Sequence, residues 1–246
     1  MHKPTRKHFK RRKVVVPNVN HSVMADLIDY RKYSRQNQGF KYILVVIDAF
    51  SRFAYTAPLK FKTAEDSAKA LDSIFSNFLH PPTMFSSDKG NEFTTKNPFI
   101  RKILVEKYQM QVFTMSGRTK VRTSSLICVF IIFQGSIVER WNRTFKTRLE
   151  RYFTENKTTK WIDVLEDFTR NINNTVNRTI GMEPGKVTPK NAHQIRERLY
   201  GSEDQVIPCK LKTGDKVRIP RIKNIHAKGY AQSKYIKIKA KYLFEL

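Results

Sequence analysis

The sequence is poor in cysteine and has no long apolar run. Cys128 and Cys209 are its two cysteines, too few for a disulfide framework or a four-cysteine zinc site. The longest apolar run, residues 126–133, has eight residues and is too short to span a bilayer. No run of signal-peptide length follows the basic N-terminus, so we expect no secretory signal. These absences argue against disulfide-stapled secreted proteins and membrane proteins, and they favour an intracellular protein.

Acidic residues are also scarce, with 21 Asp and Glu against 47 Lys and Arg and a net charge of +26. This excess is far beyond what solubility needs and indicates a polyanionic partner such as nucleic acid. The charge is uneven, because residues 1–13 carry seven basic residues and no acid, and residues 205–246 carry eleven basic residues and two acids. We therefore expect two basic flanks around a more balanced core. A ribosomal-type or merely basic protein is the alternative, but it would not need the acidic residues described below.

The length of 246 residues allows one good-sized domain and a small one. We expect a basic N-terminal arm at residues 1–21, a core at residues 22–200 and a small basic β-domain at residues 209–246. In that last segment, a turn into a strand at residues 212–219 and an alternating pattern from Tyr235 predict strands.

Within the core, three apolar runs with short turns predict an antiparallel meander at residues 23–29, 42–47 and 52–58. Helical patterns follow at residues 63–78, 97–108, 136–153, 161–173 and 188–198, with strands expected at residues 83–87 and 111–114. Thr188-Pro189 is the expected N-cap and first-turn pair of the last helix. This order predicts an α/β protein with a mixed five-stranded sheet flanked by helices.

The helix predicted at residues 136–153 has two distinct faces. An apolar stripe is made by Val138, Trp141, Phe145, Leu149 and Tyr152. A second face holds Glu139, Asn142, Arg143, Lys146 and Glu150. This face could hold a metal at Glu139 with phosphate beside the cations. Taken alone, the helix favours a solvated face with a Glu–Arg pair.

Three acids stand out because each belongs to a different element. Asp26 interrupts an apolar strand, where an acid is costly unless it is paired or bound to metal, or else faces outward on an edge strand. Asp88 follows the fourth strand, at the end where sites in α/β sheets usually lie, although a plain Asp-x-Gly turn is the alternative. Glu139 lies near the start of the helix described above. Three such carboxylates can hold two divalent cations about 3.5–4 Å apart for in-line phosphoryl transfer.

Four segments in this order resemble the retroviral-type DDE integrase family. They are Ala25-Asp-Leu-Ile-Asp, Tyr42-Ile-Leu-Val-Val-Ile-Asp-Ala-Phe-Ser-Arg, Ser87-Asp-Lys-Gly-Asn-Glu-Phe and Ser136-Ile-Val-Glu-Arg-Trp-Asn-Arg-Thr-Phe-Lys-Thr. The resemblance extends from about residue 10 to residue 230 and is strongest to integrases of LTR elements and large DNA transposons. It implies a ribonuclease-H-like core followed by a small SH3-like or chromo-like module that begins near Lys212.

The resemblance also implies the site and its chemistry. Asp26, Asp88 and Glu139 become the catalytic and metal-binding triad, holding two Mg²⁺ or Mn²⁺ ions, whereas Asp29 and Asp48 do not match triad positions. We expect Asp48 to be a turn or cap residue. The residues expected to contact DNA are Asn142, Arg143, Lys146, Lys212, Lys216 and Arg218. The sequence has no His-His-Cys-Cys zinc module, so that domain is absent or the chain begins after it.

The implied activity is cleavage at the 3′ ends of a mobile element followed by DNA strand transfer. The expected partners are element-end DNA, target DNA and further copies of the chain, with no membrane and no small-molecule substrate. A DNA substrate suggests the nucleus as the location. Two other functions remain open: a catalytically impaired transposon relic that at most binds DNA, and a ribonuclease-H-like nuclease without joining activity. The intact acids favour an active integrase, and the basic tail argues against a simple nuclease.

The spacing of the last two acids departs from the family. Fifty residues separate Asp88 from Glu139, more than in the family, and removing residues 121–134 leaves 36 and joins Lys120 to Gly135. The block begins with Val-Arg, which GTA-AGA can encode, the sequence of a splice donor. It ends with Phe-Gln, which TTT-CAG can encode, the sequence of a splice acceptor. We interpret residues 121–134 as a retained intron and a spurious insertion, the alternative being a genuine strand or loop.

The family pattern also fades after Tyr230, which leaves open that the small β-domain is incomplete. The insertion and the eroded tail favour the relic.

Overall fold

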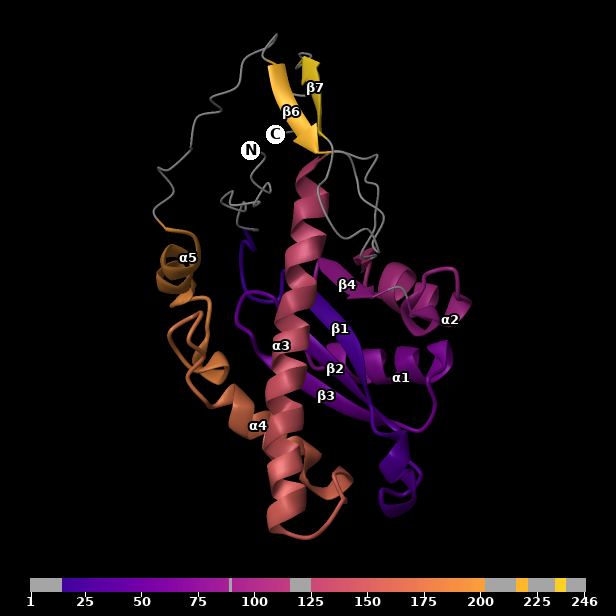
Figure 1. The fold of residues 1–246 in the computed structure, drawn as a ribbon. Coiled ribbons are helices and arrows are strands. Elements are labelled where there is room, and N and C mark those ends of the chain that lie inside the picture. Colours follow the sequence, from indigo (N-terminus) through magenta and orange to yellow (C-terminus); the bar gives the residue numbers. More distant parts are fainter. Residues whose placement is uncertain (1–14, 89, 116–124, 202–215, 221–232, 238–246) are drawn as a thin grey trace.

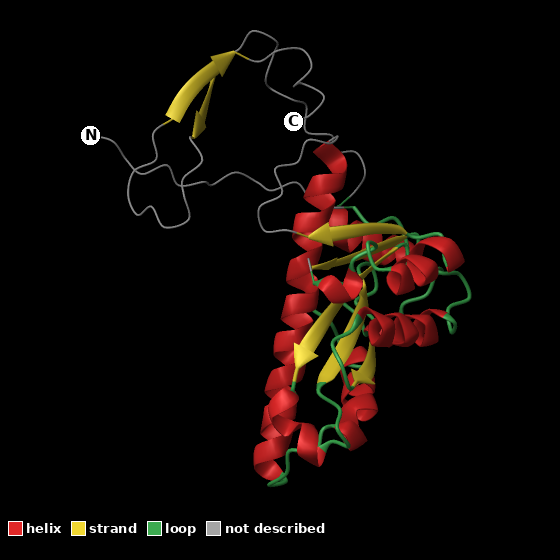
Figure 2. Cartoon of the chain, turned by 90° about the vertical axis from the view of Figure 1, so that its right-hand side faces the viewer, coloured by secondary structure: helices red, strands yellow, loops and turns green. Residues whose placement is uncertain are grey.

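The computed structural model describes residues 15–88, 90–115, 125–201, 216–220 and 233–237. A five-stranded sheet lies between two layers of helices: α3 with α4 and α5 on one side, and α1 with α2 on the other (Figures 1 and 2). This is the mixed sheet flanked by helices that the sequence predicts.

The strands and helices follow the predicted order closely. The strands are β1 (Ser22–Asp29), β2 (Tyr42–Asp48), β3 (Ala54–Leu59), β4 (Met84–Asp88), β5 (Gln111–Met115), β6 (Lys216–Pro220) and β7 (Ser233–Lys237). The α-helices are α1 (Ala64–Phe75), α2 (Pro98–Ile100), α3 (Ser125–Glu155), α4 (Leu165–Asn173) and α5 (Ala192–Tyr200), and a π-helix, η3 (Arg101–Lys107), continues α2. The 3₁₀ segments are η1 (Arg31–Gln36), η2 (Asn91–Phe93), η4 (Ile162–Val164) and η5 (Pro184–Lys186).

The sheet has the strand order β3-β2-β1-β4-β5. β1, β2 and β3 pair antiparallel, as expected for a meander, whereas β4 lies parallel to both β1 and β5. In the parallel pair, Ala25 of β1 lies opposite Ser87 of β4. The residues that follow these two, Asp26 and Asp88, are therefore at the same place on neighbouring strands.

The alternation of β1 decides which helical layer each side chain meets. Met24 and Ile28 belong to the apolar cluster shared with α3, whereas Val23 and Ala25 belong to the cluster shared with α1. Because side chains of a strand alternate between its faces, Asp26 lies on the α3 face. The fold thus directs the one acid in the middle of β1 toward the helix that carries Glu139.

The apolar stripe of α3 is confirmed. Val138, Trp141, Phe145 and Leu149 are buried against the sheet, and Trp141 stacks on Phe145 with ring centroids 5.0 Å apart. Burying large apolar side chains contributes roughly 1.5–3 kcal/mol each. This packing fixes the rotation of the helix and therefore the direction of its polar face.

One local prediction, the N-cap of the last helix, and one alternative, a strand or loop at residues 121–134, are wrong. The last helix begins at Ala192 with Asn191 before it, and Thr188 instead donates its N–H to Asn191 Oδ1 at 2.8 Å. The helix α3 begins at Ser125, so residues 125–134 have a helical backbone rather than forming a strand or loop. Residues 121–124 lie outside the described residues. Helix propagation from a well-packed C-terminal half costs little per residue, which overrides the β propensity of the block.

Strands β6 and β7 form an antiparallel pair with Lys216 opposite Lys237. This agrees with the strands expected near residues 212–219 and 235–239; most of the expected SH3-like or chromo-like module lies outside the described residues. No helix in the described ranges is both long and apolar enough to cross a membrane.

Candidate active site

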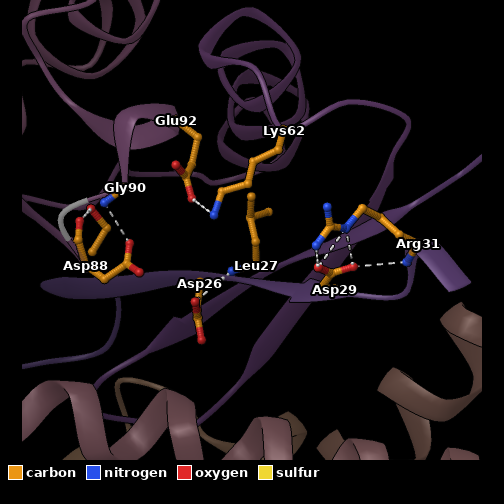
Figure 3. A network of polar contacts seen from close by, with 9 residues as sticks. Asp26, Leu27, Asp29, Arg31, Lys62, Asp88, Gly90 and Glu92 are labelled. Carbon is orange, nitrogen blue, oxygen red and sulfur yellow. Dashed lines mark hydrogen bonds and ion pairs between the residues drawn. The ribbon is translucent and has the colours of Figure 1, made fainter.

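Asp26 occupies the centre of the candidate site. Its side chain is half-buried on the α3 face of β1, and Figure 3 shows it on the opposite side of the strand from Leu27. Its Oδ1 accepts a 2.8 Å hydrogen bond from the Leu27 N–H, and its Oδ2 accepts a 2.7 Å bond from Asn142 Nδ2 of α3. The carboxylate is therefore held from both the strand and the helix, and it is not the outward-facing acid of an edge strand.

Asp88 ends β4 and is exposed, at the carboxyl end of a strand as predicted. Its Oδ1 accepts a 3.1 Å hydrogen bond from the Gly90 N–H (Figure 3). This is the geometry of an Asx turn, so Asp88 is both a turn residue and a neighbour of Asp26 in the parallel pair. Glu139 of α3 is exposed as well.

The charges of these acids act on one another. Burial raises the pKa of Asp26 most, and the carboxylates of Asp88 and Glu139 raise it further. The Leu27 N–H and the ammonium group of Lys146 oppose this and lower the same pKa. Three acids from three elements and one cation therefore share an electrostatic neighbourhood, which the sequence alone could only suggest.

The donor set fits a hard divalent cation in chemistry but is not gathered in one cluster. Carboxylate oxygens are the ligands that Mg²⁺ and Mn²⁺ favour. Among the residues described, no three His, Cys, Asp or Glu side chains lie close enough together to hold a metal ion. Asn142 Oδ1 is buried without a hydrogen-bond partner beside Asp26. The three carboxylates and the unpartnered amide oxygen of Asn142 are all hard oxygen ligands, the kind that a divalent cation prefers.

The residues of α3 that the sequence predicts to contact DNA divide into two kinds. Arg143 and Lys146 are exposed and available to bind phosphate, and Lys146 acts electrostatically on Asp26. Asn142 is instead buried and directed to Asp26. Of the remaining residues predicted to contact DNA, Lys212 lies outside the described residues, and only the backbone of Lys216 and Arg218 is described.

Asp29 and Asp48 have structural roles, which the sequence analysis predicted for Asp48. Asp29 pairs with Arg31 at 2.8 Å, which holds the pKa of Asp29 below its ordinary value. The buried carboxylate of Asp48 accepts bonds from the Ser51 hydroxyl at 2.6 Å, the Ser51 N–H at 2.8 Å and the Asn20 N–H at 3.0 Å. This confirms Asp48 as the cap of the turn after β2.

The sequence analysis missed the pair formed by Glu92 and Lys62. Glu92 lies four residues after Asp88 in the sequence, and its side chain is 4% exposed. Its Oε1 forms an ion pair with Lys62 Nζ at 2.9 Å (Figure 3). A Cβ atom on residue 90 would overlap the Glu92 carboxylate, so a larger residue there would displace that side chain. The charge of Asp88 also raises the pKa of Lys62. The only signal in the sequence was an acid just before Phe93 in a Gly-containing turn.

Comparisons with known proteins show similarity to integrases. Residues 17–125 match the model of the integrase core domain family. Over 207 residues the chain is 31% identical to the transposon-derived protein F54H12.3 of Caenorhabditis elegans, covering 82% of this chain and 62% of that protein. Over 161 residues it is 29% identical to the Pol polyprotein of Feline endogenous virus ECE1, covering 65% of this chain and 14% of the polyprotein. The chain thus spans less than two thirds of the length of either relative.

Solved structures share the fold. The HTLV-2 integrase catalytic core domain in complex with magnesium superposes with a TM-score of 0.52 and 17% identity, over 70% of this chain and 97% of that domain. A chain of the simian T-cell lymphotropic virus intasome gives a TM-score of 0.57 and 16% identity, over 95% of this chain and 73% of that chain. The fold and the matched family define a ribonuclease-H-like integrase core. Residues 17–125 are an integrase core domain of the retroviral type, and the chain is similar to proteins of transposon and retroviral origin.

Proposed function

We propose that the chain is the integrase of a mobile element and performs metal-dependent 3′-end cleavage and DNA strand transfer. The observation that carries this proposal is geometric: Asp26 and Asp88 lie at the same level of neighbouring parallel strands, and Asn142 of α3, the helix that carries Glu139, donates a 2.7 Å hydrogen bond to Asp26. Acids of one site that sit beside a phosphate-binding cation suit chemistry on a phosphodiester.

In this proposal Asp26, Asp88 and Glu139 hold two Mg²⁺ or Mn²⁺ ions. When bound, such ions polarise the phosphodiester and stabilise the attacking and leaving oxygens of an in-line displacement. Asn142 and the Leu27 N–H fix the orientation of Asp26. The carboxylates of Asp88 and Glu139 are exposed, so an ion can reach both from solvent.

The reaction has two displacements at phosphorus. In the first, a water oxygen forms a bond to a phosphorus near the element end, and the P–O bond to the 3′ oxygen breaks to leave a 3′-hydroxyl. In the second, that hydroxyl forms a bond to a target phosphorus and one target P–O bond breaks. The proton of each nucleophile is lost and the leaving oxygen gains one. Arg143 and Lys146 bind the backbone of the element end beside the acids, which positions the reacting phosphate.

The basic composition supports DNA as the substrate, because Lys and Arg contacts to phosphate give sequence-tolerant binding. We assign this role to the flanks at residues 1–21 and 209–246 as well. Related integrase cores have been solved as a dimer and a trimer, and we propose that this chain also acts as a homo-multimer. A DNA substrate places the proposed activity in the nucleus.

A strand-transfer assay tests the proposal. The chain is given pre-cleaved element-end DNA and a target plasmid, with Mg²⁺ or with EDTA. We expect joined products only with metal, and loss of joining in Glu139→Gln without loss of DNA binding. Glu150→Gln, another exposed acid of α3, is the matched control and should join normally. Metal-independent DNA binding without joining by any variant would favour the relic, and cleavage without joining would favour a simple nuclease.

A further inference from the structure

A cleft of about 920 Å³ lies on the side of α3 away from Asp26. Its walls come from α3, from the turn at residues 175–179 and from the C-terminal end of α5. Along α3, Asn142 meets Asp26 while the preceding residue, Trp141, lines the cleft. The cleft is therefore separate from the candidate active site, although both are built on the same helix.

The cleft is strongly cationic. Four arginines line it, with no Asp or Glu among the lining residues: Arg52, Arg140, Arg148 and Arg178. In the ranges that the structure describes, none of these four guanidinium groups forms an ion pair with a carboxylate. Four cations around one cavity without paired anions repel one another, and an anionic ligand would remove that cost.

Arg52 is one of the two half-buried arginines of the cleft. The backbone of Arg52 has a φ of 65°, an uncommon value for a non-glycine residue. Its side-chain Nη1 donates a 2.6 Å hydrogen bond to the Ala49 carbonyl. Burial lowers the pKa of Arg52, and the charge of Arg140 lowers it further, while Tyr200 and Asp48 act in the opposite direction. The Asp48 carboxylate is already occupied by Ser51 and Asn20. The backbone thus holds a cation at the cleft without a carboxylate of its own.

A second arginine of the cleft also lacks a good acceptor, because Arg148 reaches Thr175 Oγ1 only at 3.5 Å. Arg140 and Arg148 are eight residues apart on the helix, or roughly 12 Å along its axis. Spaced cations and unsatisfied donors call for a ligand with several acceptor oxygens along its length.

We propose that this cleft binds the phosphodiester backbone of a DNA strand, at a second phosphate-binding site on the side of α3 opposite the acids. A volume of about 920 Å³ suits a nucleotide-sized segment rather than a whole duplex. The choice of DNA over other phosphates rests on the proposed function. The arginine fork, with its paired N–H donors, matches the geometry of phosphate oxygens.

The test measures binding without catalysis. Fluorescein-labelled single-stranded DNA is titrated in EDTA at several salt concentrations with the full chain, the double variant Arg140→Ala/Arg178→Ala and the control Arg35→Ala/Arg151→Ala. All four substituted arginines are exposed, so each double variant removes the same charge from the surface. We expect the cleft variant to bind about 10-fold more weakly, with a slope of log K against log salt smaller by roughly 1.4, at about 0.7 per lost phosphate contact. The control should keep the slope of the full chain.

Equal slopes in the two double variants would overturn the inference. Tripolyphosphate is the second probe: if it binds in an arginine-dependent way while the DNA slope does not change, the cleft takes a small phosphate compound and the DNA assignment is wrong. A photo-crosslinking residue, p-benzoylphenylalanine, at Val176 of the cleft should crosslink to DNA, whereas the same residue at the exposed Leu79 should not. Because none of these readouts needs metal, the cleft and the strand-transfer activity can fail separately.

Discussion

The side-chain amide of Asn142 donates a 2.7 Å hydrogen bond to Oδ2 of Asp26 and so joins α3 to the middle of β1. The two residues are 116 positions apart in the chain, yet this contact sets how the helix carrying Glu139 faces the strand carrying Asp26. A ligand carboxylate that is oriented by a second residue is the usual arrangement of metal sites.

Replacing Asn142 by Ala should therefore weaken catalysis as well as folding. Loss of a residue that orients a metal ligand typically costs about 10–100-fold in activity, and we expect a loss of that size in strand transfer. The free energy of unfolding should fall by about 1–3 kcal/mol, since a buried hydrogen bond is removed. Asn171→Ala, an exposed position of α4, is the control. Normal strand transfer by Asn142→Ala would contradict a positioning role.

The pair between Lys62 and Glu92 should stabilise the turn after Asp88. In Lys62→Met the nearly buried Glu92 carboxylate loses its 2.9 Å partner, and we expect unfolding free energy to drop by about 1–3 kcal/mol. Lys69→Met breaks a pair of similar length whose partner, Glu65, is far more exposed, and it should have no measurable effect. Urea denaturation of both variants makes the comparison. Equal effects would mean that the burial of Glu92 is irrelevant.

Tyr55 should make the protein sensitive to alkali. Its ring lies between Phe53 and Phe78, with both centroids 4.8 Å away, and burial, followed by the charge of Asp48, raises the pKa of Tyr55 to about 12. The unfolded phenol ionises near pH 10. The folded state thus binds more protons between these values, so stability is fully present below pH 10 and is lost as the pH rises toward 12.

The Tyr55→Phe variant should reduce this loss by about 2 kcal/mol or less. Urea denaturation at pH 9, 10, 11 and 12 measures it, with Tyr152→Phe as the control for removing one phenol. The same steepness of decline in Tyr55→Phe and the unmodified chain would show that other groups control the alkaline limit.

Residues 121–134 remain interpreted as a retained intron, and the match to the integrase core family ends at residue 125, inside this block. Transcript reads across the junction test the gene directly: the main transcript should lack the block. At the protein level, the chain lacking Val121–Gln134 should join DNA better than the full chain. In the full chain, α3 extends back to Ser125, and the segment between Asp88 and Glu139 is longer than in the family. Unspliced reads in the main transcript, with equal joining by both chains, would make the block a genuine part of the protein.

The sequence predicts most of the core because its signals are local. The apolar run at Ile43–Ile47 and the stripe of Val138, Trp141 and Phe145 need no partner to be recognised, and the structure confirms both. The start of α5 was misplaced because Thr188-Pro189 has the residue types of a cap, while the Asn191 side chain makes the actual bond to the Thr188 N–H.

The site could be predicted only in part, for a different reason. The identities of Asp26, Asp88 and Glu139 follow from the motifs and their order in the chain. The hydrogen bond between Asp26 and Asn142 depends instead on how α3 packs against β1. Asn142 was assigned to DNA because it shares a helix face with Arg143, and nothing within its own segment shows that it is buried. The Lys62–Glu92 pair is hidden in the same way, since its two residues are 30 positions apart on separate elements.

The central claim is that Asp26, Asp88 and Glu139 form one metal site. Crystals of the chain with element-end DNA and Mn²⁺, measured at the manganese absorption edge, test it most directly. We expect anomalous peaks from manganese among the three carboxylates, and the loss of these peaks in Glu139→Gln. Manganese bound elsewhere, or no peak at these residues while DNA is in place, would contradict it.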